Sequence, residues 1–145
     1  MDNLILVKPT IDLKEKALEY KKEHFDNGEE IINGSALLDK LDYEDWIKHI
    51  EKSSNPETVD ENWVEASTFF VIRETDQRII GMVDIRHRIN KFLALFGGHI
   101  GYSVRPSERK KGYGTKILEM ALKYAKTINI QRVMLACYKE NEGSR

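Results

Sequence analysis

The chain has 145 residues, a length that suits one domain built around one hydrophobic core. Hydrophobic residues make up 41% of the sequence and charged residues 32%, which is typical of a soluble globular protein. No apolar run approaches the roughly 20 residues that span a bilayer, and the single cysteine, Cys137, cannot form an internal disulfide. We therefore expect a single domain over residues 1–145, located in the cytoplasm and without a membrane partner.

The formal net charge of −1 conceals an uneven distribution. Residues 1–65 hold 8 Lys against 17 Asp and Glu, a balance of −9, whereas residues 66–145 hold 15 Lys and Arg against 7 acidic residues, a balance of +8. An acidic half could help to collect a cationic acceptor, or it could consist simply of solvated helix faces. The near-neutral total and the lack of a basic stripe interleaved with aromatic residues argue against nucleic-acid binding.

The first half of the chain predicts one strand and two helices. Residues 3–8 are rich in Leu, Ile and Val and stop at Pro9, which is typical of a strand. Good helix formers predict a helix over residues 13–25, and Asp42 is placed as the N-cap of a second helix over residues 43–52. The order strand, helix, helix follows.

The second half predicts a hairpin and then a strand, helix and strand. Residues 66–73 and 79–86 are rich in β-branched and aromatic side chains and flank a short polar turn. A strand over residues 98–104 leads to a helix after Gly112, and residues 133–137 form an apolar run typical of a buried strand. The order β-α-α-β-β-β-α-β indicates the α/β class, an α+β mixed sheet, whose last βαβ unit has parallel strands and a right-handed crossover.

A glycine-rich, basic turn joins the strand over residues 98–104 to the next helix. Gly112 and Gly114 allow a ligand to approach the main chain, and the first amides of the helix lack internal partners. Anions bind at such helix starts. Cationic side chains surround the turn with only Glu108 opposing them: Arg105, Arg109, Lys110, Lys111 and Lys116. The pattern predicts a site for a pyrophosphate, the alternative being an ordinary glycine turn with solvated lysines.

The six residues from Arg109 to Gly114 match the signature Arg/Gln-x-x-Gly-x-Gly/Ala, and the chain resembles the GNAT superfamily of acyl-CoA N-acyltransferases. Residues 101–106 are similar to the fourth strand of that fold and its exit, and the hairpin is similar to its second and third strands. Asn141-x-x-Ser144 resembles the start of its next motif. The resemblance covers nearly the whole chain and is strongest over residues 66–144.

This resemblance implies a GNAT-like fold and acetyl-CoA as the cosubstrate. By analogy, the amides from Lys110 to Thr115 hold the pyrophosphate of coenzyme A, and the main chain from Tyr102 to Val104 pairs with the pantetheine arm. The cofactor-binding residues expected on this basis are Val104, Arg109, Lys110, Lys111, Gly112, Tyr113, Gly114, Thr115 and Asn141.

The resembled fold normally continues with a helix and two more strands, on the order of 30 residues within the usual domain size. This chain stops at Arg145, so we expect the C-terminal part of the domain to be missing, the alternative being a sheet that is completed in another way. A truncated sheet would leave an unpaired edge at residues 132–137, which predicts association, for example as a homodimer, or poor solubility.

Amine acylation needs a base near neutral pH, because an ammonium must lose its proton before it attacks a thioester. The sequence offers His87, His99, Glu30 and Asp84 for this role. In the resembled family a base on the strand before the signature falls close to His99, which is therefore the leading candidate. Strand alternation puts His99 on the face opposite Ile100 unless a bulge intervenes, and a hydrogen-bonded structural histidine is the alternative.

Two further features bear on the reaction. Tyr102 could protonate the departing thiolate, or it could serve only in packing. The polar cluster over residues 86–90 either lines the acceptor site or forms a basic surface turn. His99, Tyr102 and His87 are the predicted catalytic residues, and no cluster has the spacing of metal ligands.

The sequence as a whole predicts an N-acetyltransferase that transfers an acetyl group from acetyl-CoA to a primary amine by direct attack. Amides of the strand over residues 98–104 would polarise the thioester carbonyl. The acceptor would be a small-molecule or peptide amine. A non-catalytic module of the same fold that binds or senses acyl-CoA is the alternative.

Overall fold

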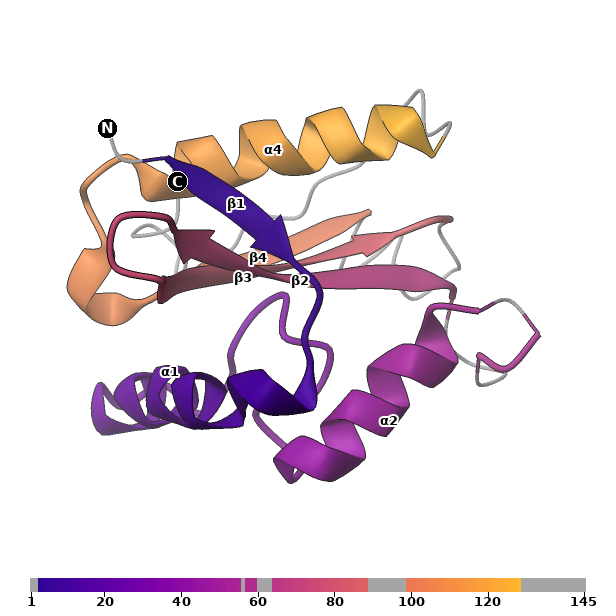
Figure 1. Cartoon of the computed structure of the whole chain (residues 1–145), viewed down its shortest axis with the longest axis horizontal. Helices are drawn as coiled ribbons and strands as arrows, with labels where there is room; N and C mark the ends of the chain where they lie inside the picture. The colour runs from indigo at the N-terminus through magenta and orange to yellow at the C-terminus, as the bar shows by residue number, and fades with distance from the viewer. Residues whose placement is uncertain (1–2, 56, 60–63, 89–98, 129–145) are drawn as a thin grey trace.

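The fold is an antiparallel sheet between two layers of helices. The computed structural model describes residues 3–55, 57–59, 64–88 and 99–128. Within them, neighbouring strands pair in chain order and all pairs are antiparallel: β1 (Leu4–Val7), β2 (Ala66–Arg73), β3 (Arg78–Arg86) and β4 (Ile100–Val104). The helices are α1 (Lys14–Asp26), α2 (Tyr43–Ser53) and α4 (Tyr113–Thr127), with single 3₁₀ turns at η1 (Ile11–Leu13) and η2 (Pro106–Glu108). Figure 1 shows α4 on one face of the sheet and α1 and α2 on the other.

The two central strands are buried on both faces, because helices cover both sides of the sheet. β2 and β3 therefore read as nearly continuous apolar runs rather than as alternating ones. Their register is interrupted once, between Val71 and Ile72. β3 and β4 pair in unbroken register from Ile85–Ile100 to Gly81–Val104, so the described part of β4 contains no bulge.

Each face of the sheet has its own core. The face under α4 buries Val83, Ile100, Val104 and the apolar stripe of α4 that includes Ile117 and Ala121. The opposite face buries Tyr20 of α1 and Trp46 of α2 against the other side of β2 and β3. Trp46 is fully buried, and its indole N–H donates to the Ser35 carbonyl at 2.7 Å, which holds the segment between α1 and α2 under the sheet.

The predicted α/β class and the order of elements up to α4 are confirmed, with boundaries that differ by one or two residues. Asp42 stands at the N-cap of α2 as predicted, but its side chain makes no capping hydrogen bond. The strand predicted over residues 133–137, its parallel pairing and its open edge all lie outside the described residues. Across the part of the chain that the structure describes, no helix has the length and apolarity needed to cross a membrane.

Candidate functional site

The turn between β4 and α4 has the backbone geometry of an anion site. Gly112 is the N-cap of α4 and has φ of 86°, in the left-handed region that favours glycine. Lys110 has φ of 63°, which is uncommon for a residue with a side chain. Two left-handed residues so close together turn the chain sharply, so that α4 begins directly after the basic stretch.

Several amides of this turn have no hydrogen-bond acceptor within the described chain. The first helical hydrogen bond of α4 runs from Lys116 N–H to Gly112 O at 3.3 Å. Ahead of it, five backbone N–H groups have no acceptor among residues 3–55, 57–59, 64–88 and 99–128, namely those of Lys110, Lys111, Gly112, Gly114 and Thr115. Such groups, together with the positive end of the helix dipole, are suited to hold a phosphate.

The cations around the turn are more strongly opposed than the sequence suggested, and the prediction that only Glu108 opposes them is wrong. Arg105 is 2% exposed and turns under the sheet, where its Nη1 donates to Glu19 at 3.0 Å and its Nε donates to Ile79 O at 2.9 Å. The Arg109 guanidinium is paired with Glu29. These carboxylates come from α1 and from the segment after it, more than 70 residues earlier in the chain.

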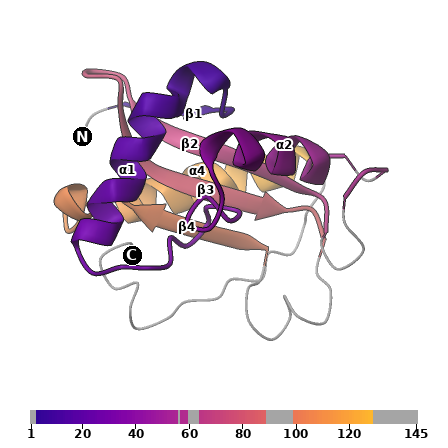
Figure 2. The same ribbon diagram turned by 90° about the horizontal axis from the view of Figure 1, so that it is seen from below.

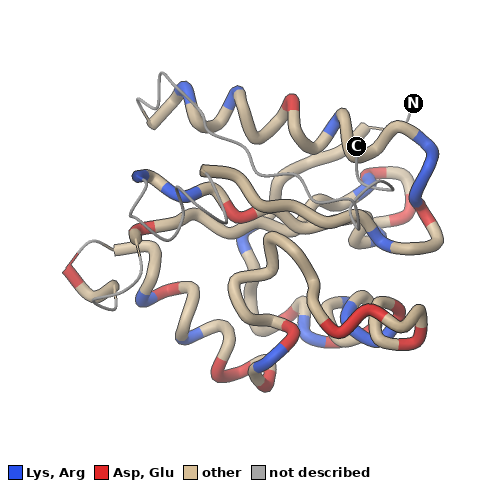
Figure 3. The backbone as a smooth tube through the Cα atoms, turned by 180° about the vertical axis from the view of Figure 1, so that it is seen from behind, with Lys and Arg blue, Asp and Glu red and all other residues tan. Residues whose placement is uncertain are grey.

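Lys111 is also engaged, since its Nζ donates to Glu108 at 3.1 Å. Within the described residues, Lys110 and Lys116 have no ion pair, and Lys110 is exposed. Figure 3 shows the consecutive cationic residues of the turn before α4, and the mixture of both signs along α1. An anion at this turn would therefore meet mainly backbone amides and two lysine side chains.

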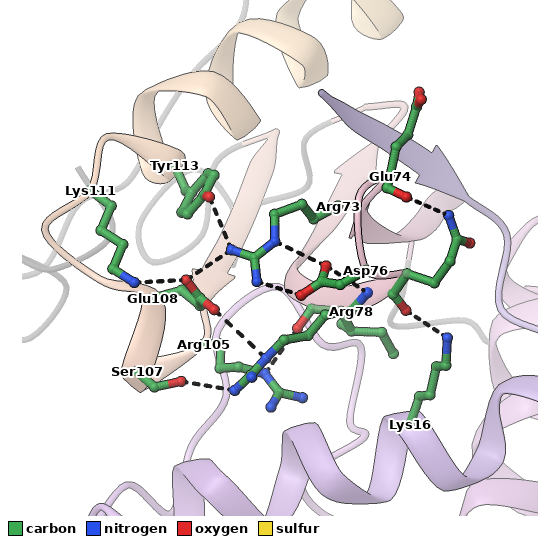
Figure 4. Close-up of polar contacts among 12 residues, drawn as sticks. Lys16, Arg73, Glu74, Asp76, Arg78, Arg105, Ser107, Glu108, Lys111 and Tyr113 are labelled. Atoms are coloured by element: carbon green, nitrogen blue, oxygen red, sulfur yellow. Dashed lines mark hydrogen bonds and ion pairs between the residues drawn. The ribbon is translucent and has the colours of Figure 1, made fainter. Parts of the chain in front are cut away.

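A network around Glu108 fixes the start of α4 to the β2–β3 hairpin (Figure 4). Arg73 Nη1 donates to Glu108 Oε1 and to the Tyr113 hydroxyl, both at 3.1 Å, while its other nitrogens donate to Asp76. Burial alone would raise the pKa of Glu108, but the hydrogen bonds from Lys111 and Arg73 lower it. No local sequence pattern links Arg73 to Glu108, and only the packing of the hairpin against η2 brings them together.

Neighbouring residues of β4 point to opposite faces of the sheet, as the unbroken register requires. Tyr102 and Val104 lie on the α4 face, where Tyr102 is half-buried against the core. Ser103 lies on the other face, where its hydroxyl is 2.7 Å from the Tyr20 hydroxyl. The Val104 carbonyl accepts a hydrogen bond from Arg109 Nε at 3.0 Å. Among the described residues β4 pairs only with β3, so its other edge carries main-chain groups that no described strand covers.

His99 lies directly before β4, and its carbonyl accepts a hydrogen bond from Arg86 N–H at 2.7 Å, which continues the β3–β4 ladder. Alternation places it on the face of Gly101 and Ser103, opposite Tyr102. Partial burial, and secondarily the nearby Arg86 guanidinium, lower the pKa of His99 below its usual value. The imidazole is therefore mainly neutral at pH 7, which is the form that can accept a proton.

His87 lies on the other face and is not brought together with His99. Its Nε2 is 2.8 Å from the Ser67 hydroxyl, which is in turn 3.0 Å from the Tyr124 hydroxyl of α4. On the far side of the ring, Nδ1 is 3.4 Å from Glu65. These contacts are those of a hydrogen-bonded histidine between the sheet and the end of α4.

Asp84 is an acidic group on the same face as His99. Its carboxylate is 3% exposed, accepts a hydrogen bond from Thr68 Oγ1 at 2.9 Å and lies 3.5 Å from Arg86 Nε. Burial, only partly offset by Arg86 and Thr68, raises its pKa. The Arg86 guanidinium reaches over Gly101, 3.2 Å from where a Cβ on that glycine would stand. Of the polar cluster over residues 86–90, Arg86 therefore lies beside β4.

Asn141 lies outside the described residues. In the portion that is described, no group of three His, Cys, Asp or Glu side chains is arranged to hold a metal ion. The structure thus brings Val104 and Arg109 to Thr115 together around one turn, with His99 and Tyr102 on the adjoining strand and His87 apart from them.

A protein-family model matches most of the chain. The model of the acetyltransferase (GNAT) family matches residues 36–145, which include both the turn and the sheet strands β2 to β4. No curated protein matches. The match covers more than half of the chain, and the order of elements and the glycine turn before α4 agree with it. The chain therefore belongs to the GNAT acetyltransferase family, and an acyl-transfer function follows from that membership.

Proposed function

We propose that the protein is an N-acetyltransferase that transfers an acetyl group from acetyl-CoA to a primary amine by direct attack. The observation that carries this proposal is the turn before α4, where five of the six backbone N–H groups from Lys110 to Thr115 have no acceptor in the described chain. Acetyl-CoA carries a pyrophosphate and supplies the acetyl group as a thioester. The turn and the family membership together support that cosubstrate.

The proposed seat of the pyrophosphate is the main chain from Lys110 to Thr115, with Lys110 and Lys116 as flanking cations. Gly112 is exposed and has no side chain that would stand between the main chain of the turn and a ligand, whereas Gly114 is buried in the first turn of α4. The side chains of Lys111 and Arg109 are bound to Glu108 and Glu29, so in this arrangement they are not ligands of the pyrophosphate.

The proposed base is His99. In the transfer, the amine nitrogen forms a bond to the thioester carbonyl carbon, the carbon–sulfur bond breaks, and the ammonium proton passes to a base. His99 supports this role because its lowered pKa keeps the imidazole neutral. Tyr102 remains the proposed acid for the thiolate, and β4 amides would polarise the carbonyl. His87 is the weaker candidate, because Ser67 and Glu65 already engage both ring nitrogens.

Calorimetry with acetyl-CoA tests the cofactor assignment. The variant Gly112→Val places a branched side chain at φ of 86° in the middle of the turn, and we expect it to abolish binding. Gly28→Val is the matched control, since Gly28 has φ of 80° and nothing within 4 Å of an added Cβ. If the two variants bind acetyl-CoA with equal affinity, the turn from Lys110 to Thr115 is not the pyrophosphate site.

A thiol-release assay tests catalysis. Spermidine, kanamycin, free lysine and a short peptide with a free amino terminus sample different classes of primary amine. Release that depends on both acetyl-CoA and one of these amines is the expected result. Tight acetyl-CoA binding without release from any amine would favour the non-catalytic binding module.

A further inference from the structure

The segment between α1 and α2 is bound to the candidate site at two points. It leaves α1 at Asn27, runs alongside β4 and returns to α2 at Tyr43, as Figure 2 shows. One point is Glu29, which contacts the turn before α4, and the other is Gly34, which contacts β4. The segment therefore contacts both Arg109, directly before the proposed pyrophosphate site, and β4, the strand proposed to hold the thioester.

Glu29 binds the signature arginine through both carboxylate oxygens. Arg109 Nη2 donates to Oε1 at 2.6 Å and Nη1 donates to Oε2 at 2.7 Å, while Arg109 Nε donates to Val104 O at 3.0 Å. This bidentate geometry is the strongest form of arginine–carboxylate pairing. Both side chains are half-buried, so solvent screens the pair only partly.

Glu29 is also held in place by residues at the C-terminal end of α1. Its N–H donates to His24 O at 2.9 Å, and its Oε1 is 3.2 Å from Nδ1 of the buried His24. Asn27 donates a further hydrogen bond to Oε2. Burial alone would raise the pKa of Glu29, but the hydrogen bonds from Arg109, Asn27 and His24 lower it to about 2. The carboxylate is therefore charged at every pH at which the protein would work.

Gly34 forms the second contact by close backbone packing. A Cβ at this position would stand 2.4 Å from Gly101 O and 2.6 Å from Tyr102 Cα. Gly34 also has φ of 70°, so its backbone conformation excludes most other residues. The close approach at Gly34 leaves no room for a side chain, and five residues earlier Glu29 supplies a directional bond to Arg109.

We propose that Glu29 is a positioning residue, which holds the segment from residue 30 to residue 41 against β4 by binding Arg109. In this arrangement Arg109 is not a phosphate ligand. It joins the turn before α4 to the segment over residues 30–41, which would form the wall of the acceptor site next to β4, on the face of the sheet that carries His99. The proposal rests on the proposed function for the identity of that wall as the acceptor side.

The variant Glu29→Gln removes the charge and keeps the size of the side chain. Glu44→Gln is the matched control, because it also removes an ion pair between two elements, that of Glu44 with Lys14, whose side chains are 52% and 42% exposed. Hydrogen exchange of residues 30–41 in the protein without ligand is the first readout. We expect it to accelerate about tenfold in Glu29→Gln and to stay unchanged in Glu44→Gln.

The second readout separates positioning from general destabilisation. With acetyl-CoA and the best amine of the panel, Glu29→Gln should raise the KM for the amine about tenfold, while kcat and the calorimetric Kd for acetyl-CoA change less than about threefold. Arg109→Gln should produce the same rise in KM, and the double variant should add little to either single variant.

Three outcomes overturn the proposal. One is equal exchange in Glu29→Gln and Glu44→Gln, the second is faster exchange with an unchanged KM for the amine, and the third is full additivity of the Glu29 and Arg109 variants. Failure of the unmodified protein to bind acetyl-CoA would instead overturn the proposed function. In that case the exchange comparison, which needs no cofactor, still decides whether Glu29 positions the segment.

Discussion

Replacing Gly34 by alanine is expected to destabilise the protein by about 2–5 kcal/mol. A residue with a Cβ in the left-handed region costs about 1–2 kcal/mol. The added methyl would also stand 2.4 Å from Gly101 O, far inside contact distance, and the backbone of β4 or of the segment must move. Such overpacking costs a further amount of about 1–3 kcal/mol.

The matched variant Gly28→Ala isolates the first of these contributions. Gly28 has φ of 80° but nothing lies within 4 Å of an added Cβ, so we expect a loss of only about 1–2 kcal/mol. Equilibrium unfolding in urea measures both variants, with equal slopes required for the comparison. If the two losses in free energy of unfolding are equal, the close packing of Gly34 on β4 does not exist as described.

Three further predictions follow from single groups. The kcat of the proposed reaction should rise with pH through a pKa below 6.5, and the variant His99→Gln should lose that limb, which a pH profile at saturating substrates measures. The ion pairing of Glu29 should contribute its full stability above the unfolded pKa near 4.5, and this contribution should be lost as the pH falls from 4.5 through about 2. The free energy of unfolding of Glu29→Gln should therefore fall less steeply with pH over this range than that of the unmodified protein, which acid unfolding measures. Tyr20→Phe should cost about 1–3 kcal/mol in thermal or urea unfolding, because it leaves the buried Ser103 hydroxyl without its partner; an unchanged stability would contradict the contact.

The contrast between Arg105 and Gly112 shows where sequence reasoning succeeds and where it fails at this site. The glycine motif singles out Gly112 as a position where the main chain needs the freedom of glycine, and its φ of 86° lies in the left-handed region that favours glycine. Arg105 was assigned to the anion because it is cationic and near the turn. It instead turns under the sheet to Glu19 and Glu23, which lie one helical turn apart on α1.

Strand alternation gave part of the answer in advance. It placed His99 opposite Tyr102, and the unbroken β3–β4 register agrees with that placement. Alternation could also have separated Arg105 from Val104, since consecutive strand residues face opposite sides. Alternation does not reveal which carboxylates lie on the α1 side of the sheet, because that depends on how α1 packs against it.

The sequence by itself determined the strands and helices as far as α4, the glycine turn and the family, since these depend on periodicity, backbone dihedral requirements and short motifs that act over a few residues. Only the tertiary structure decided which cations remain available to an anion, which face each histidine occupies and what Arg109 binds. Those outcomes depend on pairs such as Arg109 with Glu29 and Arg73 with Glu108, whose members lie 80 and 35 residues apart. A charged side chain leaves water for a partner only where the fold supplies one, and the fold is a property of the whole packed chain.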